Sequence, residues 1–102
     1  MIFVIATIEI EADRRENFLT EFHRIVPAVQ QEDGCLEYGP TIDLETNIGA
    51  QPDVRNNTVV VVEKWESIEH LERHLIAPHM LEYRKRVQDI VKGATIQVLQ
   101  PA

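Results

Sequence analysis

Four consecutive valines at positions 59–62 limit what this chain can fold into more than any other feature of the sequence. Side chains branched at Cβ favour extended backbone, and an unbroken run of them predicts a strand that is covered on both faces. Strand patterns also occupy residues 2–11, 36–44 and 94–99. In the second of these, Pro40 indicates an edge strand or a bulge. The sequence therefore predicts a four-stranded sheet.

Three helical segments separate these strands. The first begins at Asp13, where Glu16 completes the pattern of a capping box, and Gly34 ends it after a kink or a tightened turn at Pro27. Ser67 is expected to cap the second helix. The third helix is expected to begin at Pro78 and to end at Gly93. The apolar positions expected to face inward are Phe18, Phe22, Ile25, Val29, Ile68, Leu71, Leu75, Met80, Tyr83, Val87, Ile90 and Val91.

The resulting order, β-α-β-β-α-α-β, predicts one α+β domain over residues 1–102 with a ferredoxin-like split βαβ topology. Its antiparallel sheet would carry helices on one face, and 102 residues leave nothing to cover the other. We therefore expect a homodimer formed through the open sheet face. Residues 45–57 are expected to form a long loop, either a lid or a plain connection.

Composition excludes several classes of protein. Seventeen acidic residues against ten basic ones give a net charge of −7, which repels phosphate backbones and argues against nucleic acid as a partner. No apolar run has the length of a membrane span, and the first residues do not read as a signal peptide. Cys35 is the single cysteine, which fits a reducing, cytoplasmic location.

Candidate functional side chains gather in residues 63–84. Glu63 and Trp65 share one face of their strand with Val61, and a carboxylate on such a face needs a partner or a raised pKa. The helical repeat places His74 beside the apolar stripe, where it can face a cleft, and turns His70 toward water. His79 and Tyr83 lie four residues apart and neighbour each other on the third helix.

The cleft so defined combines apolar side chains with an indole, a phenol and imidazoles, which suits a small aromatic molecule. Composition alone leaves open whether it belongs to an enzyme or to a binding protein. The sequence predicts no metal site, because His70 and His74 share an outward helix face and Pro78 interrupts the geometry before His79. The basic residues 84–86 are interpreted as the solvated side of a helix.

The segment EKWESIEHLERHLIAPHMLEY, residues 63–83, resembles the signature of the antibiotic biosynthesis monooxygenase family. IVPAVQQEDGCLEYGP (25–40) and VLQPA (98–102) are similar to its quinol monooxygenase branch. The resemblance implies a dimeric α+β barrel whose enzymes oxidise quinols or phenols with O₂ and carry no flavin, haem or metal, so no cofactor is expected.

The same resemblance implies roles for the candidate residues. His74 would be the general base, with Glu63 as a second base or as its orienter. Trp65 would stack on the substrate or donate a hydrogen bond, while Tyr83 and His79 would hold its oxygens. Two alternatives stay open: a non-catalytic dimeric protein that binds quinones or other aromatics, and an isomerase of a small signalling phosphate. The axial histidine of haem-degrading relatives falls near Arg84, which argues against haem.

Overall fold

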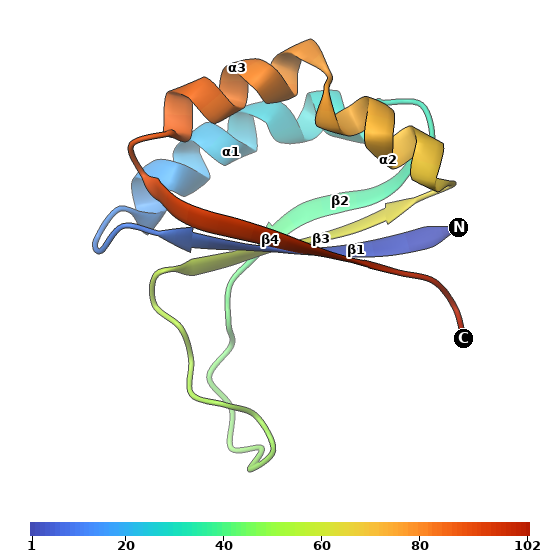
Figure 1. Cartoon of the computed structure of the whole chain (residues 1–102). Coiled ribbons are helices and arrows are strands. Elements are labelled where there is room, and N and C mark those ends of the chain that lie inside the picture. The colour runs from blue at the N-terminus through green and yellow to red at the C-terminus, as the bar shows by residue number, and fades with distance from the viewer.

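The computed structural model describes all 102 residues as a four-stranded sheet with three helices in one layer over one of its faces (Figure 1). The opposite face carries no helix. None of the three helices combines the length and the apolar character of a membrane span. The elements follow the expected order: β1 (Ile2–Ile10), α1 (Arg15–Gln30), β2 (Cys35–Thr41), β3 (Thr58–Trp65), α2 (Ile68–Leu75), α3 (Pro78–Val87) and β4 (Val91–Leu99). This is the ferredoxin-like α+β fold.

The strands lie in the order β2-β3-β1-β4, and every neighbouring pair is antiparallel. Glu63 of β3 therefore lies between Val4 of β1 and Tyr38 of β2. β2 is an edge strand, which confirms the interpretation of Pro40 and explains why a residue without an N–H is tolerated there. Both central strands, β1 and β3, point alternate side chains toward the helices.

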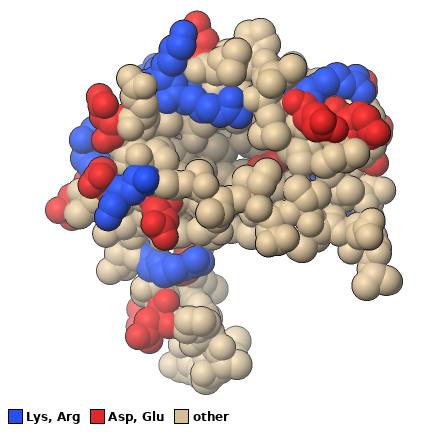
Figure 2. Space-filling model, viewed as in Figure 1, with Lys and Arg blue, Asp and Glu red and all other residues tan.

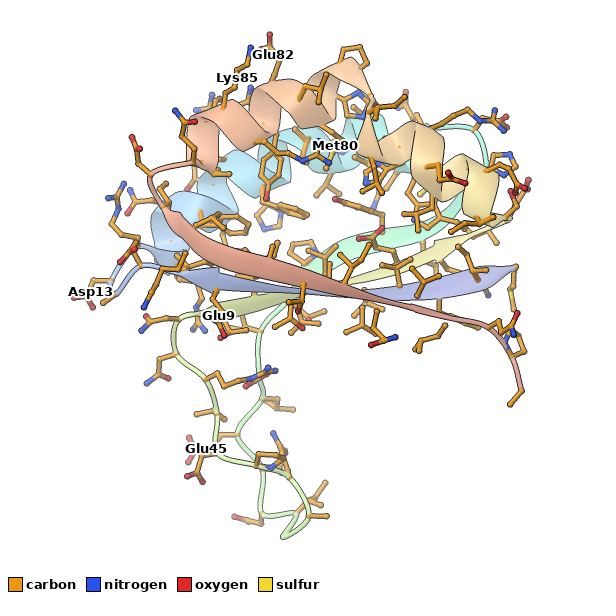
Figure 3. The ribbon with its side chains drawn as sticks, viewed as in Figure 1. Glu9, Asp13, Glu45, Met80, Glu82 and Lys85 are labelled. Carbon is orange, nitrogen blue, oxygen red and sulfur yellow. The ribbon has the colours of Figure 1, made fainter.

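The core fills the space between the sheet and the helices. α1 buries the apolar stripe expected from its periodicity, and α3 adds a second stripe (Figure 3 shows Met80 turned toward the sheet and Glu82 and Lys85 turned away). Seventeen buried residues form this single cluster: Val4, Ala6, Ile8, Ile10, Phe18, Phe22, Ile25, Val29, Tyr38, Val59, Val61, Trp65, Leu71, Met80, Tyr83, Val87 and Ile90.

Several predicted boundaries are wrong. Asp13 adopts φ 65° in a turn before α1, and no side chain caps that helix, so the predicted capping box does not form. α3 ends at Val87 and β4 begins at Val91, so Gly93 lies within the strand instead of ending the helix. β2 ends at Thr41, three residues earlier than expected. The cap at Ser67 is confirmed, because its hydroxyl accepts the His70 backbone N–H.

Two other expectations about side-chain direction fail. Ile68 does not face inward, because it is 43% exposed. The valine run is buried on one face only, because Val60 is half-buried and Val62 is 39% exposed on the face without helices. Within one chain the predicted two-sided cover is therefore missing, and a row of apolar side chains on this face remains open to water.

The long connection between β2 and β3 projects on the open side of the sheet, away from the helices (Figure 1). Its base is fastened by Arg55, whose side chain and backbone N–H donate to the Asp43 carboxylate at 2.9 Å. These hydrogen bonds lower the pKa of Asp43 to about 2. Because the loop points away from the helix layer, it is not a lid over the space between that layer and the sheet.

We predict that Gly34→Ala destabilises the fold by about 1–3 kcal/mol. Gly34 has φ +80°, and a Cβ there would lie 2.2 Å from the imidazole carbons of His70. Denaturant unfolding measures the loss. The matched control is Gly49→Ala, because a Cβ at Gly49 meets nothing within 4 Å. Equal stability of the two variants would contradict the prediction.

Candidate functional site

A cavity of about 350 Å³ lies between the sheet and the helix layer. Figure 2 shows the surface hollowed there, with basic side chains above the hollow. Most of its walls are apolar, and its volume falls within the roughly 300–1,000 Å³ typical of small-molecule sites. The lining residues are Ala6, Ile8, Phe22, Tyr38, Val61, Glu63, His74, Leu75, Met80, Tyr83, Arg84, Val87, Gln88, Val91, Ala94 and Ile96.

The cavity opens beside β4 because the helices do not cover that strand. Ile96 lies opposite Ala6 in the sheet, so both side chains point to the helix side. Ala6 is 8% exposed, whereas Ile96 is 48% exposed. The helix layer therefore closes over β1 and stops short of β4, and the gap between them is the entrance to the cavity.

Glu63 is the buried acid of this site. It is 5% exposed, and its Oε1 accepts a hydrogen bond of 2.9 Å from the indole N–H of Trp65. Burial raises the pKa of Glu63 from 4.5 to about 7, and the nearby charge of Glu32 adds to the rise, while the Trp65 hydrogen bond opposes it. Near neutral pH this carboxyl can therefore both give and take a proton.

His74 is the buried imidazole of the site and is held by a carboxylate. Its Nδ1 lies 2.9 Å from Oε2 of Glu32, and a carboxylate can only accept, so Nδ1 carries the hydrogen and Nε2 keeps a lone pair. No fully buried polar side-chain atom in the chain lacks a partner. Nε2 makes no hydrogen bond within the protein and is therefore not fully buried, which leaves it available on the residue that lines the cavity.

Burial also sets the protonation of the ring groups around the cavity. It lowers the pKa of His74, although the hydrogen bond to Glu32 opposes this, so the neutral imidazole is favoured. It raises the pKa of Tyr38 and of Tyr83, which keeps both phenols protonated. The Tyr38 ring meets His74 edge-on at 5.3 Å. A neutral base and two phenolic donors thus face one apolar space.

The structure brings together four of the six residues singled out from the sequence: Glu63, His74, Tyr83 and Val61 line the cavity. Trp65 does not line it; this side chain is completely buried, and the centre of its ring lies 4.7 Å from that of the His74 ring. Of its two expected roles, only hydrogen-bond donation fits this position, and the acceptor is Glu63.

The other two histidines of this region, His79 and His70, lie outside the cavity lining. His79 bonds Glu32 instead. His70 does not face water as expected, since its side chain is only 18% exposed where it packs over Gly34.

Sequence reasoning missed three residues of the site. Glu32 follows α1 in a turn, where nothing in the pattern distinguishes it from a solvated acid. Tyr38 was identifiable, because it occupies an inward position of the alternating second strand. Arg84 is exposed, as its interpretation as part of a solvated face predicted, but it also lines the cavity at its entrance.

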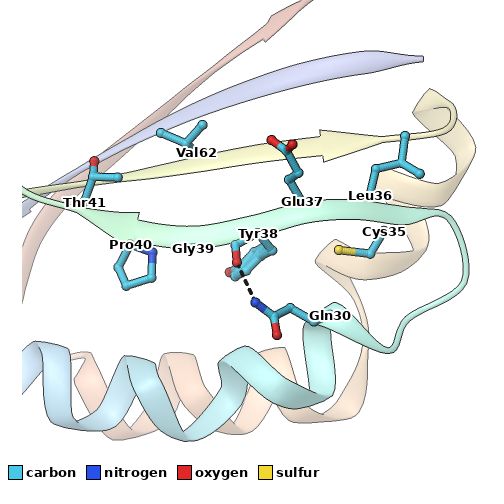
Figure 4. A pocket seen from close by; sticks show the side chains of 9 residues that line it. All are labelled: Gln30, Cys35, Leu36, Glu37, Tyr38, Gly39, Pro40, Thr41 and Val62. Carbon is cyan, nitrogen blue, oxygen red and sulfur yellow. Dashed lines mark hydrogen bonds between the residues drawn. The ribbon is translucent and has the colours of Figure 1, made fainter.

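A second hollow follows the edge strand β2 (Figure 4), where the side-chain amide of Gln30 donates to the backbone carbonyl of Tyr38. It is a shallow surface groove that contains Cys35. Burial and the charges of Glu32 and Glu63 raise the pKa of this thiol to about 11, so the reactive thiolate is scarce at neutral pH. No cluster of His, Cys, Asp and Glu side chains in the chain has an arrangement that could hold a metal ion.

Fold and site together define a small α+β domain with an apolar, base-containing cavity. Residues 1–86 match the family model described as antibiotic biosynthesis monooxygenase, and the chain belongs to that family. Its curated relatives include the "Probable quinol monooxygenase YgiN" of Escherichia coli strain K12 and of Shigella flexneri. Each is 39% identical over 99% of this chain and 98% of the relative. These matches support a monooxygenase type of function.

Solved structures agree on the fold. PA3566 from Pseudomonas aeruginosa superposes with a TM-score of 0.81 at 23% identity, covering 99% of this chain and 93% of that one. Rv0793 from Mycobacterium tuberculosis gives a TM-score of 0.80 at 24% identity, with 99% and 94% covered. These likenesses confirm the predicted arrangement of strands and helices.

We predict that Glu63→Gln removes a pH-dependent weakness of the fold. The folded-state pKa of Glu63 is raised. Its contribution to the free energy of unfolding is therefore most favourable below about pH 4.5 and is lost as pH rises through about 7. The amide introduced by the substitution cannot ionise. The variant should therefore match wild type near pH 4 and exceed it by about 1–3 kcal/mol near pH 8.

Denaturant unfolding at both pH values measures this difference. Glu72→Gln, at an exposed position of α2, is the matched control and should show no such change. A constant offset between wild type and Glu63→Gln at the two pH values would contradict the raised pKa.

Proposed function

We propose that this chain is a cofactor-independent monooxygenase that oxidises a quinol, or a related phenolic aromatic, with O₂. The observation that carries the proposal is that His74 lines an apolar cavity while Glu32 holds its Nδ1, which leaves Nε2 without a partner in the protein. A neutral base in a dry pocket is what removal of a phenolic proton requires. The names of the curated relatives support the same substrate class.

In the proposed reaction, His74 takes the proton of a substrate hydroxyl at Nε2. The electron-rich phenolate then reduces O₂ directly. One oxygen atom replaces a hydrogen on the ring, and the other leaves as water, so that quinol and O₂ become a hydroxyquinone and water. The protein contributes a base, fixed orientation and exclusion of water.

The other polar groups of the cavity have complementary parts in this proposal. Tyr38 and Tyr83 keep their protons and can donate hydrogen bonds to the oxygens of the substrate. Glu63 is about half protonated near pH 7 and can supply a proton to the departing oxygen atom. Trp65 holds Glu63 in place from behind the cavity wall.

We predict that His74→Ala lowers kcat about 100-fold or more, because general bases contribute roughly 10²–10⁴-fold. The measurement is O₂ uptake on adding a reduced naphthoquinol to the chain in the presence of a chelator, corrected for autoxidation. His23→Ala is the matched control, since His23 is exposed on α1. Unchanged uptake by His74→Ala would remove His74 as the base.

The same protein samples separate the enzyme from a binding protein for quinones. Trp65 is the only tryptophan, and its ring contacts His74 at the cavity wall, so an occupied cavity should quench its fluorescence. Quenching by a naphthoquinone without O₂ uptake on any quinol would favour the non-catalytic alternative.

A homodimer through the open sheet face completes the proposal. On the strands that neighbour β1, Val62 is 39% exposed and Leu99 is 43% exposed. The projecting loop adds Leu44, which is 75% exposed, and Ile48, which is 66% exposed. Apolar side chains gathered on one side of a small domain favour association with a second copy. The loop on that side would extend along the partner.

We predict that Val62→Glu shifts this dimer toward monomer, because it places a charge in the apolar face. Sedimentation velocity measures the mass of the particle. The matched control, Leu81→Glu, changes a residue that is 48% exposed on α3, away from the sheet. Dissociation of both variants, or of neither, would contradict an interface on the open face.

A further inference from the structure

The Glu32 carboxylate joins the buried base to the protein surface. Its Oε2 lies 2.9 Å from Nδ1 of His74 and 2.7 Å from Nε2 of His79. The side chains of His74, Glu32 and His79 are 2%, 14% and 31% exposed, so exposure rises step by step from cavity to solvent. This cluster, His74–Glu32–His79, takes one residue each from α2, the turn after α1, and α3.

The turn holds Glu32 firmly in this position. Its backbone N–H donates to the Val29 carbonyl, and its own carbonyl accepts from the Cys35 N–H. Both imidazoles donate to the same oxygen, so their nitrogens lie close together, and that single oxygen can fully compensate only one positive charge. Two imidazolium rings at this carboxylate would repel each other in a partly buried place.

We propose that His79 is a positioning residue for catalysis, which acts through Glu32 to keep His74 unprotonated until substrate arrives. Before reaction, the shared positive charge resides on His79, which is closest to solvent. When His74 takes the substrate proton at Nε2, His79 releases its Nδ1 proton to water. One proton enters the cluster and one leaves it, while the Glu32 carboxylate stays unchanged. This inference rests on the proposed function of His74 as the base.

Several groups around the cluster influence the pKa of His74. Burial is the largest influence on the pKa of His74 and lowers it. Glu32 raises that pKa, and the charges of His79 and of Arg84 on α3 lower it further. From the sheet, Tyr38 meets the His74 ring, and Glu63, whose raised pKa leaves it partly neutral, lines the same cavity. Of these groups, His79 is the one that joins the His74–Glu32 pair to solvent.

The test is His79→Gln, whose amide can still donate to Glu32 but cannot carry a charge. Histidine-ring nitrogen NMR of the full chain, from about pH 5 to about pH 9, follows both rings. In wild type, the His74 signals should respond to two steps, one of them at the midpoint of His79. In the variant that step should vanish, and the remaining His74 midpoint should rise by about one pH unit.

His23→Gln is the control, because His23 is exposed on α1 and should leave the His74 titration unchanged. A single His74 midpoint, identical in wild type and His79→Gln, would overturn the inference. This readout needs no substrate, so it fails or succeeds independently of quinol oxidation.

If the chain oxidises quinols, His79→Gln should also move the acid limb of kcat/KM about one pH unit upward and leave the alkaline plateau intact. A merely structural defect would instead lower the rate at every pH. A variant with wild-type limb and plateau would contradict the proposed coupling.

Discussion

The helices cover one face of the sheet, and on that face they stop short of β4. Both the cavity and the open face follow from this limit. Over β1 the cover is complete, since Val4 is 1% exposed, but its partner across the strands, Val98, is 38% exposed. A chain of this size buries roughly 65% of its extended surface, so three helices cannot seal a four-stranded sheet on both sides. The incomplete edge leaves room for a ligand, and the bare face leaves room for a partner.

Burial between the sheet and the helix layer explains the electrostatics of the site. Glu63 and His74 are buried deeply enough that their charged forms are penalised, which raises the pKa of Glu63 and lowers that of His74. Each is held by one hydrogen-bond partner: Glu63 by the indole of Trp65, and His74 by the carboxylate of Glu32. Burial therefore moves the pKa of the acid up toward neutrality and that of the base down, so the carboxyl can hold a proton while the imidazole stays neutral, the arrangement expected where a protein handles protons at pH 7.

Local periodicity made much of this fold predictable. The valine run, the stripe of α1 and the cap at Ser67 each depend on residues within one or two turns. The sequence-based predictions were wrong where backbone conformation or contacts between distant residues determine the structure. The left-handed Asp13 removed an expected cap, and Ile68 turned outward although its spacing matches Leu71. Glu32 was not predictable, because its imidazole partners lie 42 and 47 residues further along the chain.

Glu32 fixes the orientation and the tautomer of the histidine in the site. A lone neutral imidazole in an apolar cavity could rotate, exchange tautomers and present either nitrogen to a ligand. Hydrogen bonding at Nδ1 fixes the ring and leaves Nε2 free, and the adjacent Trp65 ring limits its tilt. Because the oxygen that fixes His74 also binds His79, the orientation of the base and its connection to solvent depend on one carboxylate.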